Sequence, residues 1–273
     1  MKSVFSTKRI SITIVIVAAI AIGYFVFQSM TSPARAVAKQ ENPVQLANEQ
    51  PKSEIKKATP SHFNGKERKV AYLTFDDGPG KYTAELLNIL KQNDAKATFF
   101  LIGEHVEQYS DLVTREKAEG HYVGMHSMTH DFKKLYTNGE YVNEMKEDQS
   151  LIAKILGESP KLTRPPYGSK PGLNEALRNK VVEAGLKVWD WTIDSLDWKY
   201  NNIPIDSASA QIVQNVLAGA TEQQEVILMH DIHPQSVAAV PAIIKGLKEK
   251  GYELEAYHED EHFSVNFWHD KRI

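Results

Sequence analysis

The stretch YLTFDDGPG at residues 72–80 decides the fold, since it has the pattern of a buried strand that ends in a turn. A mainly apolar run from Tyr72 to Phe75 leads directly into two adjacent carboxylates, Asp76 and Asp77. Aspartate and glycine are good turn formers, so an exposed turn is one interpretation. The alternative is that a positive group, such as a metal ion, lies beside the two carboxylates and offsets their repulsion.

Similar strand-like segments recur along the chain, and six helical patterns separate them. Among these, residues 83–94 place Leu86, Leu87 and Leu90 on one helical face, and residues 106–120 form another predicted helix. The predicted strands are residues 69–75, 96–102, 121–127, 161–167, 187–194, 225–231 and 252–257. Strands that alternate with helices indicate a parallel sheet with crossover connections. This part of the chain, about 190 residues, is short for the ~250 residues of a complete eight-fold barrel. We therefore predict an α/β fold with an irregular, incomplete (β/α) barrel of about seven parallel strands, with a flat doubly wound sheet as the alternative.

Composition limits the chemistry that the chain can perform. The 273 residues are 42% hydrophobic and carry a formal net charge of −3, which allows one large domain or two small ones with a sizeable core. A protein built to hold nucleic acid would usually have a basic patch, so we expect no nucleic-acid partner. There is no cysteine, which excludes thiolate metal sites, disulfides and cysteine nucleophiles. Any metal must therefore be bound by His, Asp or Glu.

Residues 1–30 form an N-terminal membrane anchor or signal segment. Basic residues precede an apolar run at residues 10–27, which as a helix would span about 27 Å at ~1.5 Å per residue, close to a bilayer core. This run is longer than the ~7–15 residues of a signal-peptide core, and we favour an uncleaved anchor with the rest of the chain outside. Small-residue sequences at residues 34–36 and 36–38 keep cleavage and secretion open as the alternative.

Three further segments follow the apolar run. Residues 31–66 are polar and lack core periodicity, so we predict a disordered linker. Residues 67–257 contain the strand and helix patterns and form the predicted catalytic domain. Residues 258–273 form a C-terminal tail, whose aromatic residues, including Phe263 and Trp268, we expect to pack on the barrel.

Polar residues that could perform chemistry recur where the predicted strands end. In parallel α/β folds, sites form at the C-terminal ends of the strands. The polar residues at those ends are Asp76, Asp77, His126, Arg164, Tyr167, Asp194, Asp197, His230 and Asp231. We therefore expect them to meet on one rim of the barrel.

The stretch GMHSMTH at residues 124–130 contains two histidines with a spacing of four. That spacing would place the imidazoles of His126 and His130 on one side of a helical turn, a common arrangement of metal ligands, although two histidines that cap a helix are the alternative. Two histidines and one aspartate supply three ligands and leave one coordination position open, as in catalytic zinc sites. We predict a divalent metal bound there, with one aspartate as ligand and the other free as a base.

Three more motifs each have a structural and a catalytic interpretation. TRPPYG at 163–168 is a rigid turn in which Arg164 can orient a carboxylate, and DSLDW at 194–198 is an acidic loop with an aromatic residue. ILMHD at 227–231 is an apolar strand that ends in His230, and a lone histidine there is more often part of the core than a catalyst. The shared rim position favours catalysis.

Five stretches together resemble the five motifs of the carbohydrate esterase family 4 polysaccharide deacetylases, the NodB homology domain. They are TFDDG (74–78), HSMTH (126–130), RPPYG (164–168), DSLDW (194–198) and LMHD (228–231), in the order and approximate spacing of that family. The resemblance covers roughly residues 67–257, and the HDIHP stretch with the anchor is similar to bacterial peptidoglycan N-acetylglucosamine deacetylases. It implies a hydrolase that removes N-acetyl groups from a cell-wall polysaccharide and releases acetate. Chitin-type, xylan and exopolysaccharide substrates share these motifs and remain alternatives.

The resemblance also implies roles for individual residues. The ligands of one divalent ion, usually Zn²⁺ with Co²⁺ or another ion as alternatives, would be Asp77, His126 and His130. The catalytic group would be Asp76 as general base, Arg164 holding that base, His230 as general acid and Asp197 tuning Arg164 or His230. The substrate-binding group would be Tyr167, whose backbone amide would bind the oxyanion, together with Trp198, Leu228 and Pro165 around the acetyl group.

Two interpretations from other classes compete with a deacetylase. Two histidines and one carboxylate also form the facial triad of iron(II) oxygenases, but the Asp pair and the histidine acid argue against that class. A non-catalytic wall-binding protein could use the same fold, although the presence of both Asp76 and His230 argues against it. We expect a monomer attached to the cell membrane through residues 10–27, with the domain extracellular, facing the wall and its N-acetylglucosamine-containing glycan.

Overall fold

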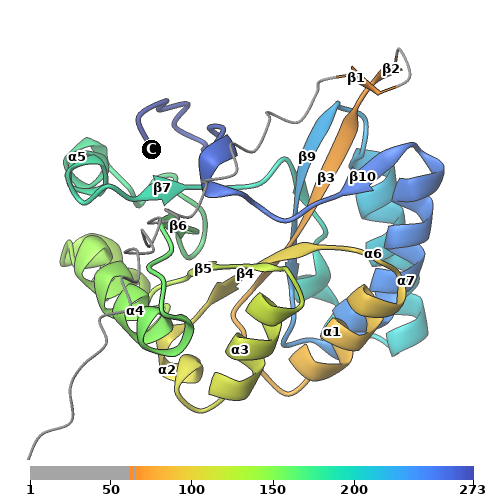
Figure 1. The fold of residues 1–273 in the computed structure, drawn as a ribbon, viewed down its shortest axis with the longest axis horizontal. Coiled ribbons are helices and arrows are strands. Elements are labelled where there is room, and N and C mark those ends of the chain that lie inside the picture. Colours follow the sequence, from red (N-terminus) through yellow and green to blue (C-terminus); the bar gives the residue numbers. More distant parts are fainter. Residues whose placement is uncertain (1–61, 64–65) are drawn as a thin grey trace, which may run out of the picture. The chain divides into compact units, whose positions relative to one another are not determined.

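The computed structural model describes residues 62–63 and 66–273 of this protein (Figure 1). Within that part of the chain, no helix combines the length and the apolar character needed to cross a bilayer. The predicted anchor at residues 10–27 and most of the predicted linker lie outside the described residues.

The described chain contains one short hairpin and one large parallel sheet. The hairpin pairs β1 (His62–Phe63) with β2 (Lys66–Glu67). The sheet consists of β3 (Lys69–Asp76), β4 (Ala97–Leu101), β5 (Tyr122–Met125), β6 (Leu162–Thr163), β7 (Lys187–Val188), β8 (Ile193–Asp194), β9 (Gln224–His230) and β10 (Tyr252–Leu254). Its order is β7-β6-β5-β4-β3-β9-β8, and β10 pairs with β3. Every pairing in the sheet is parallel, as the alternating pattern predicts.

The strand β3, which contains the first part of the YLTFDDGPG stretch, lies at the centre of the sheet. β9 pairs with it from Val70 to Asp76, while β4 pairs with its second half and β10 with its first three residues. All residues from Ala71 to Asp76 are buried. A strand covered on both faces needs a nearly continuous apolar sequence, which explains the run before the two aspartates.

The barrel is incomplete because no strand ladder joins β6 to β9 in the described chain. One extended segment at residues 187–194 spans this gap. The sequence predicts a single strand at 187–194, but the structure divides it into β7, beside β6, and β8, beside β9. Between them, Trp189 N–H donates to the Thr163 carbonyl (3.0 Å) and Thr192 N–H to the Val226 carbonyl (2.8 Å). The prediction of one strand was wrong because the chain changes partner midway. Counted as one strand position, β7 and β8 give the predicted number of seven.

Helices cover the outside of the sheet (Figure 1). The α-helices are α1 (Thr83–Gln92), α2 (Gly103–Val106), α3 (Ser110–Ala118), α4 (Tyr141–Leu156), α5 (Glu175–Glu183), α6 (Ile205–Gly219) and α7 (Pro234–Glu249). Short helical turns are η1 (Lys133–Thr137), η2 (Asp197–Tyr200) and η3 (Glu259–Glu261). On α1, Leu86, Leu87 and Leu90 are buried on one face, as predicted. One helix was predicted to begin at Val106 and continue to residue 120; instead α2 ends there, and α3 starts after the non-helical Tyr109 (φ −117°, ψ 34°).

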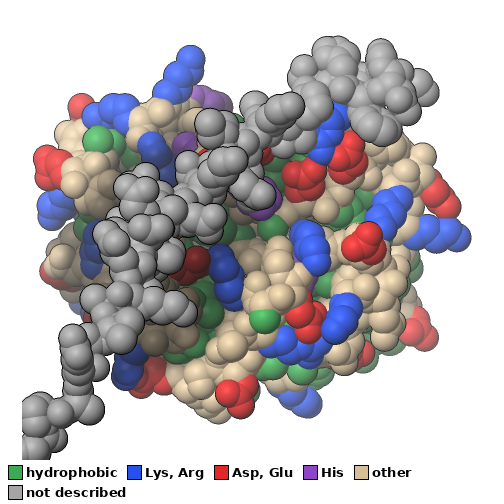
Figure 2. Space-filling view, viewed as in Figure 1, with side chains coloured by type: hydrophobic (Ala, Val, Ile, Leu, Met, Phe, Trp, Pro, Cys, Tyr) green, Lys and Arg blue, Asp and Glu red, His purple; other side chains and the backbone are tan. Residues whose placement is uncertain are grey.

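The C-terminal tail packs on the barrel, as expected from its aromatic residues. The ring of Phe263 lies 5.4 Å from that of Tyr72 and 4.8 Å from that of Trp189. Trp268 contacts the main core, and the side chain of Ile273 is fully buried. On the face shown in Figure 2, acidic and basic side chains are interspersed, with hydrophobic side chains between them.

Candidate active site

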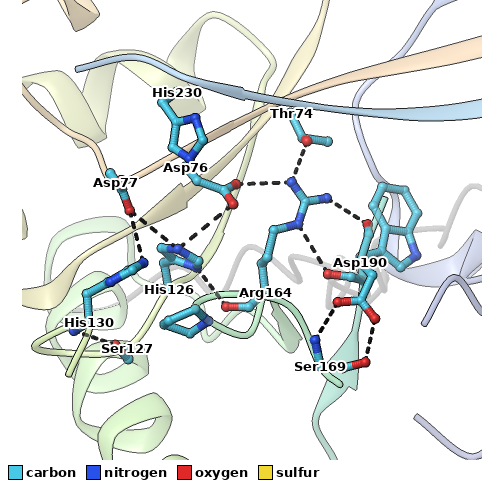
Figure 3. A network of polar contacts seen from close by, with 12 residues as sticks. Thr74, Asp76, Asp77, His126, Ser127, His130, Arg164, Ser169, Asp190 and His230 are labelled. Carbon is cyan, nitrogen blue, oxygen red and sulfur yellow. Dashed lines mark hydrogen bonds and ion pairs between the residues drawn. The ribbon is translucent and has the colours of Figure 1, made fainter. Parts of the chain in front are cut away.

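Of the polar residues predicted at the strand ends, Asp76, Asp77, His126, Arg164 and His230 lie close together (Figure 3). Asp76, the last residue of β3, lies opposite His230, the last residue of β9, in the register of the two strands. Neighbouring strands are about 4.8 Å apart, so these two residues are close. His126 directly follows β5, and Arg164 directly follows β6. Parallel strands therefore bring together motifs that are far apart in the sequence.

Asp77, His126 and His130 form a compact group of ligand atoms, here called the metal cluster. Oδ1 of Asp77 lies 3.4 Å from Nε2 of His126 and 3.6 Å from Nε2 of His130. The three ligand atoms lie within 4.8 Å of one another. Ligands at ~2.0–2.1 Å from a tetrahedral zinc ion are about 3.3–3.4 Å apart. In the described chain, the Asp77 Oδ1 atom is buried and accepts no hydrogen bond, so the cluster fits a divalent cation.

The protonation of the cluster also suits a cation. Nδ1 of His126 lies 2.7 Å from the Arg164 carbonyl, which can only accept, so Nδ1 carries a proton and Nε2 is the nitrogen that is available as a ligand. Burial and the neighbouring His126 lower the pKa of His130, which keeps it neutral. Burial alone would raise the pKa of Asp77, but interaction with His126, His230 and His130 outweighs it and holds the pKa below its ordinary value. The donor set is one carboxylate and two imidazoles.

The two cluster histidines lie on a loop, so the predicted helical turn was wrong. Residues 126–130 contain no helix, and both Ser127 (φ 71°) and His130 (φ 55°) have left-handed backbone conformations. The His130 N–H donates to Oγ of Ser127 at 3.0 Å, which closes the loop on itself. The imidazoles therefore approach each other because the loop is tightly folded, with ring centroids 5.0 Å apart.

Two buried carboxylates of α4 support this loop. Glu144 accepts hydrogen bonds from the backbone N–H groups of Met128 and Thr129, both at 3.1 Å. One turn further along the helix, Asp148 accepts from the His126 N–H at 3.2 Å. Sequence reasoning missed both residues, although acidic residues on the buried face of a helix are an available signal, since buried charges need partners.

Asp76 has a different environment from its neighbour Asp77. Its carboxylate is 2% exposed, and its Oδ1 accepts from Nη1 of the fully buried Arg164 at 3.0 Å. Thr74 accepts from the same guanidinium nitrogen, and the guanidinium lies 4.2 Å from the centroid of the Phe100 ring. The backbone of Asp77 (φ 74°) turns the chain immediately after Asp76. Asp76 is thus fixed by a cation, with its Oδ2 3.8 Å from Nε2 of His126, while Asp77 lies closer to both imidazoles.

His230 is fixed in a similar way by Asp197, the first residue of η2. Oδ1 of Asp197 accepts from His230 Nδ1 at 2.8 Å, and Oδ2 accepts from the His230 N–H at 2.8 Å and from Ser236 Oγ at 2.6 Å. Burial lowers the pKa of His230, but Asp197, followed by Asp76 and Asp77, raises it to about 9. His230 is therefore an imidazolium at neutral pH. Of the two partners predicted for Asp197, the structure shows contact with His230.

The predicted substrate-binding residues lie on the segments that carry the residues described above. Tyr167 is 58% exposed, its hydroxyl donates to the His130 carbonyl at 3.0 Å, and its backbone is left-handed (φ 65°). Among the described residues, no group accepts from its backbone N–H. Trp198 is 46% exposed on η2, Leu228 is 4% exposed on β9, and Pro165 is buried in the turn after Arg164.

Asp231 lies beneath the site rather than on its surface. It is fully buried and accepts a hydrogen bond from the Thr83 hydroxyl at the start of α1. A Cβ atom at Gly78 would collide with its carboxylate, so the turn after Asp77 requires glycine. The position predicted for Asp231 at the end of the strand was correct, but its contacts are with the turn that carries the metal cluster.

Sequence reasoning also missed Asp190, between β7 and β8. Its backbone carbonyl accepts from Nη2 of Arg164 at 3.0 Å, and its buried carboxylate accepts from Ser169 and from the Phe267 N–H. The available signal is a charged residue inside the apolar stretch VWDWT. That signal gives no indication of its partners, since these come from distant parts of the chain.

The structure is an incomplete parallel barrel, and its rim holds a carboxylate and an imidazolium beside a cluster that fits a metal. These features are typical of hydrolases that use acid–base catalysis. The model of the family described as "Polysaccharide deacetylase" matches residues 63–189. A full-length relative, described next, is 76% identical. The chain belongs to the polysaccharide deacetylase family and is an enzyme of that family.

Three similar proteins show the range of this family. A peptidoglycan-N-acetylglucosamine deacetylase of Bacillus cereus is 76% identical over 273 residues, which are 100% of both chains. A peptidoglycan-N-acetylmuramic acid deacetylase of Bacillus subtilis is 35% identical over 217 residues, 79% of this chain and 44% of that protein. The crystal structure of a polysaccharide deacetylase from Bacillus cereus has 81% sequence identity and a TM-score of 0.75, and the match covers 76% of this chain and 100% of that one.

Proposed function

We propose that this protein is a metal-dependent peptidoglycan N-acetylglucosamine deacetylase, which hydrolyses the N-acetyl amide and releases acetate. The observation that carries the proposal is the placement of Asp76 and His230 on adjacent strand ends, beside the metal cluster. The similarity to a Bacillus cereus protein named as a peptidoglycan-N-acetylglucosamine deacetylase, at 76% identity, supports the choice of substrate.

The proposed mechanism assigns a proton-transfer role to each of the two fixed groups. Asp76, oriented by Arg164, accepts a proton from the attacking water as the oxygen adds to the acetyl carbonyl carbon. His230, held protonated by Asp197, donates its Nε2 proton to the leaving nitrogen as the C–N bond breaks. The backbone N–H of Tyr167, which has no acceptor among the described residues, would donate to the oxyanion. The products are acetate and a glucosamine unit in the glycan.

The metal cluster and the acetyl pocket complete the proposed site. Asp77, His126 and His130 would hold one divalent ion, which when bound polarises the acetyl carbonyl as a Lewis acid. We propose zinc, since one carboxylate and two imidazoles are common zinc ligands, with cobalt or another divalent ion as a substitute. Around the acetyl group, the proposed walls are Trp198, Leu228 and Pro165.

Other polymers remain the alternatives for the substrate. The similarity to an N-acetylmuramic acid deacetylase at 35% identity makes the other sugar of peptidoglycan a second candidate. Chitin-type, xylan and exopolysaccharide substrates would use the same residues, because the acetyl group and its hydrolysis are shared. The high identity to a protein named for N-acetylglucosamine favours that sugar.

Acetate release from defined substrates tests the proposed function. The full-length protein, loaded with zinc, is incubated separately with purified peptidoglycan, N-acetylglucosamine oligomers and acetylated xylan. We expect acetate from the first two substrates. Muramidase digestion of the treated peptidoglycan followed by mass spectrometry should locate the acetyl loss on N-acetylglucosamine. The Asp76→Asn variant is the control for contaminating activity. Acetyl loss on N-acetylmuramic acid would reassign the substrate, and no acetate from any polymer would contradict a deacetylase.

We also propose a location for the enzyme. Anchored by residues 10–27 as a monomer, it would present the domain to the cell wall on the outer side of the membrane. This location matches the proposed substrate, because peptidoglycan lies outside the cell membrane. Cleavage after the apolar run would instead release the domain into the wall.

A further inference from the structure

The Arg164 guanidinium depends on a segment outside the sheet ladder. Nε donates to the Trp189 carbonyl at 3.2 Å and Nη2 to the Asp190 carbonyl at 3.0 Å, while Nη1 donates to Asp76 and Thr74. Burial lowers the pKa of Arg164, and the carboxylates of Asp76 and Asp190 oppose that effect. A fully buried cation with several directed bonds can only be placed as accurately as its acceptors. The carbonyls of Trp189 and Asp190 therefore contribute to the position of Arg164.

Asp190 itself is held from three directions. Its carboxylate accepts from the Ser169 N–H at 2.7 Å, the Ser169 hydroxyl at 2.5 Å and the Phe267 N–H at 2.6 Å. Its own N–H donates to the Val265 carbonyl at 2.7 Å. The side chain is fully buried, so each of these bonds forms away from bulk water. Figure 3 shows Ser169, Asp190, Arg164 and Asp76 as one continuous line of polar contacts.

The C-terminal tail supplies the rest of the support. Residues 263–268 run beside the segment at 189–190, with an isolated parallel bridge between Trp189 and Val265. Nε1 of Trp189 donates to the Phe263 carbonyl at 2.9 Å, and Nε1 of Trp268 donates to the Ser169 carbonyl at 2.9 Å. The tail thus contacts both Asp190 and its partner Ser169.

We infer that Asp190, together with the tail residues 263–268, positions Arg164 and through it the base Asp76. These are positioning residues, since they touch neither substrate nor the metal cluster. The inference rests on the proposed function, because it needs Asp76 to act as the base. It gives the C-terminal tail a part in catalysis in addition to its contribution to the core.

The substitution Asp190→Asn removes the negative charge and replaces one accepting oxygen with a donating NH₂ group. One donor among Ser169 and Phe267 then loses its acceptor, and the 189–190 carbonyls shift relative to Arg164. We expect kcat for acetate release to fall by about 10- to 100-fold, since misplacement of ~1 Å costs rates of this order. KM and the bound zinc content should stay unchanged.

A double-mutant cycle with Asp76→Asn separates positioning from general damage. If Asp190 acts through Asp76, Asp190→Asn has no further effect on kcat in the Asp76→Asn background, because the coupled effects are non-additive. The milder Ser169→Ala variant goes through the same cycle, so a poorly folded Asp190→Asn protein does not end the test. Glu225→Gln is the matched control: Glu225 is also a buried carboxylate that accepts from two backbone N–H groups and a hydroxyl, but it does not contact Arg164.

The outcomes distinguish this inference from the proposed function. The positioning role of Asp190 is supported if Asp190→Asn and Ser169→Ala lower kcat only when Asp76 is present, while Glu225→Gln changes kcat less than about threefold. Equal fold losses in both backgrounds, or full activity of folded Asp190→Asn protein, would overturn it. A wild-type protein that releases no acetate from any polymer would contradict the proposed function instead.

Discussion

At the scale of single residues, backbone conformation separates two carboxylates that are adjacent in sequence. A left-handed conformation is uncommon for residues other than glycine and is retained where the surroundings enforce it. Asp77 has it, and so do further residues of the motif stretches: Ser127, His130, Tyr167 and Leu196. These conformations therefore concentrate at the rim that holds the proposed site, where they direct each side chain.

The two aspartates should respond differently to the same substitution. Asp76→Asn removes no metal ligand, so we expect it to retain zinc and lose ~10²–10⁴-fold in kcat, the usual range for a general base. Asp77→Asn should weaken zinc binding, with activity partly restored by added zinc or cobalt. Metal content and acetate release, each with and without added metal, check both outcomes. Loss of metal by Asp76→Asn together with its retention by Asp77→Asn would reverse the two roles.

The ion pair of His230 with Asp197 predicts the alkaline limb of the pH profile. The pKa of His230 is raised to about 9, so the imidazolium, which is the proposed acid, is present below that pH and is lost as the pH rises through it. Asp197→Asn removes the negative charge that raises the pKa of His230. The alkaline limb of the kcat/KM profile should then move to lower pH, toward the ordinary histidine pKa of about 6.5. Asp194→Asn is the control, since that carboxylate accepts from the Leu196 N–H and does not touch His230. An unmoved limb would show that His230 is not the acid.

At the scale of elements, periodicity predicts the helices better than the connections. The leucines of α1 follow a helical period, and that face is buried as expected. No local signal shows that 187–194 divides between two sheet partners, because the division depends on Val226 and on the tail carbonyl of Val265. The motif residues could be identified because they follow the predicted strands and match the motifs of the family that the sequence resembles. Asp190 was missed because its contacts come from parts of the chain that only folding brings together.

The support of the histidine loop by α4 makes a prediction about metal affinity. In Glu144→Ala, the N–H groups of Met128 and Thr129 lose their acceptor, and each such loss costs about 1–3 kcal/mol when buried. The loop that carries His130 should loosen, and the dissociation constant for zinc should rise by about 10- to 100-fold. Competition with a chelator measures this dissociation constant. The control is Glu147→Ala, on the exposed face of the same helix, and an equal loss in both variants would remove Glu144 from this role.

At the scale of the whole molecule, the barrel depends on its last residues. The extended segment between β7 and β8 spans the gap, and the tail pairs with that segment through the bridge between Trp189 and Val265. The family match ends at residue 189, before the tail, whereas the full-length relative includes it. The parts of the domain that complete the barrel are thus also those that support Arg164. This coupling cannot be read from motifs, since each motif describes only its own strand end.

The apolar run at residues 10–27 makes the final prediction. As an uncleaved anchor of about bilayer length it should keep the full-length protein in the membrane fraction after washing with high salt. The substitution Ala36→Leu tests cleavage, because Ala36 belongs to both candidate sites and signal cleavage requires small residues there. If the anchor is uncleaved, the variant and the wild type should sediment alike and keep their original N-termini. A wild type that is soluble with an N-terminus at Val37 or Lys39, and a variant that becomes membrane-bound, would show instead that the run is a removable signal.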